Sequence, residues 1–123
     1  MKREIKFKAK SIYNGEWVYG DLVHQIDGTH IYMGKGGNGR TLCPRVDPST
    51  VCQFTGLKDC KGKEIWEGDI VERVIYDLFK GSTKVKAVIE YLDGAFVAIT
   101  DGIPYSLYFK YIKVIGNKFD KEK

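Results

Sequence analysis

The sequence contains few of the residues from which most active sites are built. Its 123 residues include only two histidines, His24 and His30, and three cysteines. Acid–base and nucleophilic catalysis need a base or nucleophile held beside a second functional group. No Gly-x-Ser-x-Gly, His-x-x-x-His or Walker sequence is present to supply one. The sequence therefore predicts a protein that is not an enzyme and that uses no cofactor.

The cysteines also lack the spacing of a metal site. Cys43, Cys52 and Cys60 are separated by nine and eight positions, whereas structural zinc sites use closely spaced pairs of ligands. Their number is odd and no export signal precedes them, so we expect reduced thiols instead of disulfides. The carboxylates of Glu64, Glu67 and Asp69 cluster in the sequence, but hard cations take additional oxygen ligands from elsewhere. We predict no metal site.

Long apolar runs and dense basic blocks are missing as well. No stretch approaches the roughly 20 apolar residues that span a bilayer, and the N-terminus has no signal-peptide core. We expect a cytoplasmic protein that does not contact membranes. The net charge of +4 is mild and does not indicate a dedicated binder of duplex nucleic acid. With 43% hydrophobic and 29% charged residues, the composition is that of a folded globular chain.

What the sequence does contain is alternation with a period of two residues. Apolar residues alternate with lysines in Ile5–Lys10. Val85, Ala87, Ile89 and Tyr91 alternate with Lys84, Lys86, Val88 and Glu90. This period of two predicts strands with one face toward solvent. The dipeptides Asn14–Gly15, Asp27–Gly28 and Asp93–Gly94 are typical of hairpin turns. No segment of helix length shows a 3.6-residue stripe, so the predicted fold is mainly β.

The stretch Phe54–Val71 is the densest in turn signals. We expect Thr55–Leu57 to interrupt a strand and Asp59–Lys63 to form a tight turn. Asp69 is expected to shape a corner and to open a strand that ends near Phe79, followed by a loop over residues 80–83. Trp66 and Ile70 are expected to pack under that corner.

The same stretch resembles a known family. Phe-Thr-Gly-Leu-Lys-Asp and Gly-Lys-Glu-Ile-Trp-Glu-Gly-Asp-Ile-Val are similar to the hallmark of the YopX-like family of phage and prophage proteins. The opening Arg3–Ala9 and the ending Val114–Asn117 also resemble that family, whereas Gly20–Pro48 does not. The resemblance implies a β-rich fold and a phage or prophage setting, and it brings no catalytic residues.

The order of strands and turns after Glu67 looks like that of a small SH3-like barrel. We therefore expect one YopX-like domain over residues 1–123. Within it, an N-terminal β-sheet (residues 1–53) would pack with an SH3-like barrel (residues 54–117), followed by a frayed charged tail (residues 118–123). The segment from Tyr105 to Tyr111 fits either a strand or a short helical turn.

Two segments are candidates for nucleic-acid binding. Aromatic and basic residues interleave at Tyr108, Lys110, Tyr111 and Lys113, where aromatic rings can stack on bases and lysines can contact phosphates. The alternative is that these aromatics fill a core or an oligomer interface. Gly34, Gly36 and Gly39 match a phosphate-loop pattern, but an extended segment ending at Pro44 follows instead of a helix. We interpret the segment as a mobile hairpin loop in which Lys35 and Arg40 are candidate phosphate contacts.

Three functions remain open. The favoured one is a phage or prophage accessory protein without enzymatic activity, acting through protein contacts or self-association. The alternative is a nucleic-acid-binding small barrel, whose affinity would fall steeply with salt. The third is an enzyme of a kind that no motif reveals. Exposed strand edges and aromatic β surfaces favour self-association.

Overall fold

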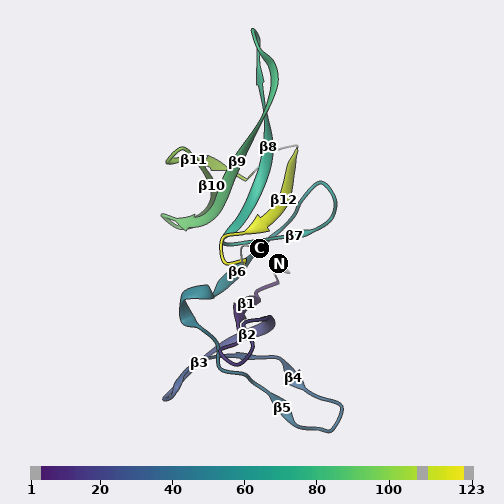
Figure 1. Cartoon of the computed structure of the whole chain (residues 1–123), viewed down its shortest axis with the longest axis vertical. Helices are drawn as coiled ribbons and strands as arrows, with labels where there is room; N and C mark the ends of the chain where they lie inside the picture. Colours follow the sequence, from purple (N-terminus) through teal and green to yellow (C-terminus); the bar gives the residue numbers. More distant parts are fainter. Residues whose placement is uncertain (1–3, 108–110, 121–123) are drawn as a thin grey trace. The chain divides into compact units, whose positions relative to one another are not determined.

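The structure is a computed structural model that describes residues 4–107 and 111–120, and its regular elements are antiparallel strands and one 3₁₀ turn (Figure 1). The prediction of a mainly β protein is confirmed. The chain divides into two compact units, Met1–Phe54 and Thr55–Lys123. Each unit contains its own cluster of buried apolar side chains.

In the first unit, neighbouring strands lie in the order β3-β2-β1-β6. The elements are β1 (Phe7–Lys10), β2 (Trp17–Gln25), β3 (Gly28–Tyr32), β4 (Gly34–Lys35), β5 (Thr41–Leu42), the 3₁₀ turn η1 (Pro48–Thr50) and the start of β6 (Cys52–Lys58). The core consists of the buried residues Ala9, Ile31 and Val46, with half-buried apolar side chains around them.

The three hairpins expected in this unit are present, with small shifts. The first turn is longer than Asn14–Gly15 alone, because it is closed by hydrogen bonds from the N–H of Gly15 to the carbonyl oxygen of Ser11 and from the N–H of Ser11 to the carbonyl oxygen of Glu16. In the second, Gly28 already pairs with Gln25, so the turn residues are Ile26 and Asp27. The glycine-rich segment forms the β4–β5 hairpin, and no helix follows it. The interpretation of that segment as a hairpin loop is therefore confirmed.

The expectation that the lysines of β1 face solvent is wrong for Lys8. Its side chain is only 7% exposed, and its Nζ lies 4.5 Å from the centroid of the Trp17 ring. The Nζ of Lys10 lies 5.3 Å from the same ring. A lysine can cover an aromatic face with its methylene stem while its ammonium group interacts with the ring. Both faces of β1, the apolar one and the one that carries the lysines, are therefore buried or half-buried.

In the second unit, five strands lie in the order β11-β10-β9-β8-β12. They are β8 (Asp69–Asp77), β9 (Gly81–Leu92), β10 (Ala95–Thr100), β11 (Ile103–Ser106) and β12 (Ile112–Asn117), and β7 (Glu64–Trp66) pairs with β6. The core consists of Ile65, Val71, Ala87, Ile89, Ala98, Ile112 and Val114. The expected SH3-like barrel is not confirmed. In the described part of the chain, the edge strands β11 and β12 do not pair with each other, so this sheet is not closed.

Several expected boundaries in this unit are wrong for identifiable reasons. Strand β6 does not stop at Thr55, because Gly56 takes a φ of 87° within the strand and lets it continue. Strand β8 ends at Asp77 and not near Phe79, and the turn is Leu78–Lys80. Trp66 is buried as expected, but Ile65 joins the core in place of Ile70, which is only half-buried.

The C-terminal tail is more ordered than expected as far as Asp120. The N–H of Lys118 donates to the carbonyl oxygen of Gly68, and the Asp120 carboxylate accepts from the N–H of Asn117. The described residues contain no helix that is long and apolar enough to cross a membrane.

Candidate functional site

The family-like motif forms a structural corner, centred on Asp59. Its Oδ1 accepts hydrogen bonds from the N–H groups of Lys61 and Lys63, at 2.9 and 2.8 Å, and so closes the predicted turn. Its Oδ2 accepts from the N–H of Val114 at 2.9 Å, in the last strand of the sheet. One carboxylate thus joins a local turn to a strand 55 residues away.

Asp69 occupies a second buried position in the same corner. Its Oδ2 accepts from the N–H of Trp66 at 2.8 Å, and its Oδ1 accepts from the side-chain amide of Asn117 at 2.9 Å. The expectation that Asp69 shapes the corner is confirmed. Both of its oxygens are occupied by N–H donors, as ligands of a cation would not be. Among the described residues, no group of three or more His, Cys, Asp or Glu could hold a metal ion.

The predicted nucleic-acid residues are divided between the two units. Tyr111 and Lys113 are exposed at the start of β12, in the second unit. Lys35 and Arg40 are exposed in the β4–β5 hairpin of the first unit. Tyr108 and Lys110 lie outside the described residues.

Around Lys113 the charges have both signs. Lys113 pairs with Glu72 across the β12–β8 ladder, and Glu72 pairs with Lys86 across the next. Directly opposed residues project from the same face of a sheet, so an acidic residue separates the two lysines. Lys84 Nζ also lies 3.8 Å from Glu72 Oε1. This face is therefore not the continuous basic stripe that binds phosphate backbones.

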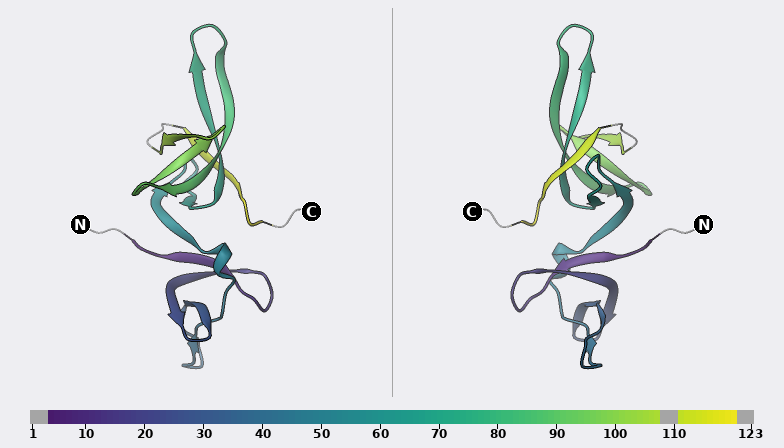
Figure 2. Two further views of the ribbon diagram at one scale, coloured as in Figure 1. Left: turned by 90° about the vertical axis from the view of Figure 1, so that its left-hand side faces the viewer. Right: turned by 90° about the vertical axis from the view of Figure 1, so that its right-hand side faces the viewer.

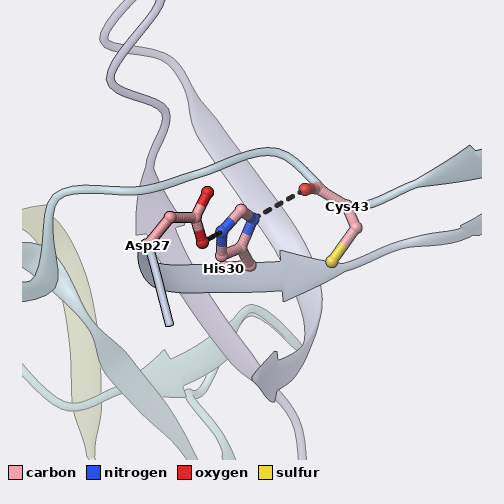
Figure 3. A network of polar contacts seen from close by, with 3 residues as sticks. All are labelled: Asp27, His30 and Cys43. Carbon is pink, nitrogen blue, oxygen red and sulfur yellow. Dashed lines mark hydrogen bonds and ion pairs between the residues drawn. The ribbon is translucent and has the colours of Figure 1, made fainter. Parts of the chain in front are cut away.

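His30 is the centre of a polar network in the first unit (Figure 3). Its Nε2 lies 2.9 Å from Asp27 Oδ1, and its Nδ1 lies 3.0 Å from the main-chain oxygen of Cys43. The ring nitrogens contact the main-chain oxygen of Cys43 and the Asp27 carboxylate, not the Cys43 thiol. A carboxylate and a carbonyl oxygen only accept hydrogen bonds, so both contacts form only when both ring nitrogens carry protons. The arrangement favours a charged imidazolium and does not form a Cys–His nucleophile pair.

The protonation state of His30 should therefore affect the stability of the first unit. The hydrogen bond to the Cys43 carbonyl and the Asp27 carboxylate raise the pKa of His30 above its ordinary value of 6.5. Its contribution to stability is present below 6.5 and is lost as the pH rises through the raised pKa. The bond to His30 lowers the pKa of Asp27 below 3.8, so that contribution is lost only as the pH falls through the lowered value.

We expect an NMR titration of the His30 ring to give a pKa above 6.5. We also expect the urea midpoint of the first unit to fall on going from neutral to mildly alkaline pH. Asp27→Asn removes the carboxylate and should lower the His30 pKa, whereas Asp47→Asn removes a carboxylate that bonds Ser49 instead. An unchanged His30 titration in Asp27→Asn would contradict the assignment.

Among the described residues of the second unit, the most exposed apolar side chains lie at the tip of the β8–β9 hairpin. Leu78 is 100% exposed, Phe79 is 96% exposed and Tyr76 is 81% exposed. The hairpin extends beyond the other strands of its sheet (Figures 1 and 2). Asp77 Oδ1 accepts from the N–H of Phe79 at 2.7 Å, which orders the turn. This tip was not expected from the sequence, although Asp77 and Gly81 around two large apolar residues are a recognisable turn signal.

A pocket of about 620 Å³ lies elsewhere in the same unit. Its apolar lining comes from Leu57, Ile65, Phe96, Leu107 and Ile112, and polar lining comes from Thr55, Lys58, Asp59, Cys60 and Ser106. Pockets of this volume are large enough for a drug-sized molecule. The Asp59 carboxylate is occupied by three main-chain N–H groups, so it shapes the pocket wall and has little remaining capacity to bind a ligand.

The fold and these features define an antiparallel β protein of two units whose most recognisable motif is structural. The model of the family described as YopX protein matches residues 6–122, and the chain therefore belongs to the YopX family. It is also similar to protein EF1440 from Enterococcus faecalis in its crystal structure, with 26% identity over 94% of each chain and a TM-score of 0.59. No curated protein matches the chain. The resemblance noted in the sequence is confirmed.

Proposed function

We propose that this protein is an accessory protein of a phage or prophage that acts in the cytoplasm by contacting proteins and that catalyses no reaction. The observation that carries the proposal is the β8–β9 tip, where Leu78 and Phe79 are almost fully exposed. Water-exposed apolar side chains are ordinary when scattered singly, but a cluster on an ordered projection is typical of an interaction surface.

The conformation of the tip is also fixed by strand pairing and turn hydrogen bonds within the chain itself. Strands β8 and β9 pair without interruption from Ile70–Val88 to Asp77–Gly81. Asp77 Oδ1 accepts from the N–H groups of Phe79 and Lys80. Holding the apolar side chains on an ordered turn reduces the entropy lost on association. Little of the free energy gained by burying Leu78 and Phe79 is therefore offset by ordering the turn.

The test is a photo-crosslinking amino acid in place of Phe79 in the full-length chain, irradiated in the expressing cells. We expect a discrete protein adduct whose crosslinked peptide is identified by mass spectrometry. The matched control is the same substitution at Ile26, which is fully exposed at the β2–β3 turn. Equal labelling from positions 79 and 26, or no protein adduct from position 79, would contradict the proposal.

The second candidate function, nucleic-acid binding, is distinguished by a different measurement. The exposure of Lys113 and Tyr111 and of Lys35 and Arg40 favours it, and the acidic Glu72 beside Lys113 opposes it. Fluorescence anisotropy with labelled DNA and RNA would show binding that weakens steeply with salt and is reduced in Lys113→Ala. That result, together with no protein adduct from position 79, would replace the proposal by this alternative.

A further inference from the structure

We propose that the β8–β9 tip of one copy of this chain inserts into the pocket of a second copy, with Leu78 and Phe79 among Leu57, Phe96 and Leu107. The inference rests on the proposed function and names the partner as the chain itself. It joins two features of the second unit, an apolar projection and an apolar-lined pocket.

The two surfaces match in size and chemistry. The pocket of about 620 Å³ exceeds the volume of one leucine and one phenylalanine side chain, and five of the ten described residues that line it are apolar. Leu57 is 45% exposed and Phe96 and Leu107 are half-buried, so the apolar lining is accessible from outside. Burying the tip there removes apolar surface of both partners from water, which drives association.

The charges at the two surfaces do not oppose the contact. The tip carries Asp77 and Lys80, and the pocket lining contributes Lys58 and Asp59. Among the described residues, each side thus has one acid and one base. Opposite charges at the rim of an interface fix its register more than they add affinity.

A tip cannot occupy the pocket of its own chain. Ile112 lines the pocket and pairs with Arg73 on β8. Leu78 lies five residues further along, or roughly 16 Å at the rise of an extended strand. The paired hairpin extends beyond the other strands of its sheet (Figure 1). A tip that enters the pocket therefore comes from another copy.

A tip-in-pocket contact joins two different surfaces, so each copy keeps one free tip and one free pocket. Such a heterologous contact produces an open chain or a closed ring, not a two-fold dimer. Because the tip offers only a few side chains, the contact area is small and association is expected to be weak. We expect average mass to rise with concentration over about 10 µM to 1 mM in sedimentation velocity.

Two variants and their mixture test the geometry with the full-length chain. The tip variant is Leu78→Ser with Phe79→Ser, and the pocket variant is Leu57→Asp, at a position exposed enough for the fold to accept it. Each alone should remain monomeric, while Ile26→Ser should associate as the wild type does. Their mixture should form a one-to-one dimer and nothing larger, because only the intact pocket of one and the intact tip of the other can meet.

The inference is overturned if the wild type is monomeric throughout, if either variant associates like the wild type, or if the mixture stays monomeric. Circular dichroism must show that both variants are folded, and Leu57→Ser replaces Leu57→Asp if that variant is not. Association that needs the tip but not the pocket would overturn the inference and leave the proposed function standing. A Phe79 crosslink only to a different protein would have the same meaning.

Discussion

Gly20→Ala is expected to destabilise the first unit by about 3 kcal/mol or more, because no side chain fits at this position. A Cβ atom on Gly20 would lie 2.1 Å from the main-chain oxygen of Tyr32 and 2.9 Å from its carbonyl carbon. These atoms belong to the neighbouring strand β3, so they cannot move aside as the end of a flexible side chain can. Gly20 itself has a φ of 157°, at the margin of the region that favours glycine.

The measurement is urea unfolding followed by tryptophan fluorescence. The chain has two tryptophans, Trp17 in the first unit and Trp66 in the second. In a Trp66→Phe background, the signal of Trp17 reports the first unit alone, and its midpoint should fall sharply in Gly20→Ala. Gly37→Ala is the matched control, because a Cβ atom there has no neighbour within 4 Å. Equal midpoints for the two variants would show that β2 and β3 can separate at Gly20 without cost.

Gly20 also shows where prediction from the sequence stops. The alternation and the turn dipeptides predicted the strands and most of the hairpins, because side-chain direction and turn geometry are set by neighbouring residues. The close approach of Gly20 to Tyr32 depends on the geometry at the end of the β2–β3 ladder, where Asp21 pairs with Tyr32. A single glycine within a strand does not specify that geometry. The open sheet of the second unit was missed for a similar reason, since strand order does not determine whether the two edges pair.

The candidate interaction surface could be predicted less well than the fold. Tyr111 and Lys113 are predicted as nucleic-acid contacts because the alternation of aromatic and basic residues is visible in the sequence. Glu72, which lies opposite Lys113, is 41 positions away and becomes its neighbour only through the strand register. From the sequence, Leu78 and Phe79 are expected to continue β8, since apolar residues in an extended run normally indicate burial. Only the turn at Asp77 and Gly81 exposes them.

Asp59→Ala should destabilise the second unit by about 4 kcal/mol, because it removes three hydrogen bonds to a charged acceptor. Two of them close the Asp59–Lys63 turn. The third is donated by the buried N–H of Val114, which alanine leaves without this acceptor. A main-chain donor buried without a partner costs free energy that no local rearrangement of the turn recovers.

Asp77→Ala is the matched control, because Asp77 also accepts two main-chain N–H groups within a turn. Its turn is exposed, and water can replace the lost acceptor, so we expect a loss below about 1 kcal/mol. Unfolding is followed through Trp66 in a Trp17→Phe background. Equal losses in the two variants would mean that the bond to Val114 adds nothing to the local turn.

The pH dependence of unfolding tests whether Asp59 stabilises the second unit as a charged carboxylate. Burial opposes ionisation of this carboxyl, but the N–H groups of Val114, Lys63 and Lys61 together lower its pKa below 3.8. Its contribution is therefore present above 3.8 and is lost as the pH falls through the lowered pKa. The difference in stability between wild type and Asp59→Ala should shrink over that acidic range. The Asp59 carboxylate of the family motif therefore stabilises the corner of this unit, whereas the binding surface proposed above is the separate β8–β9 hairpin.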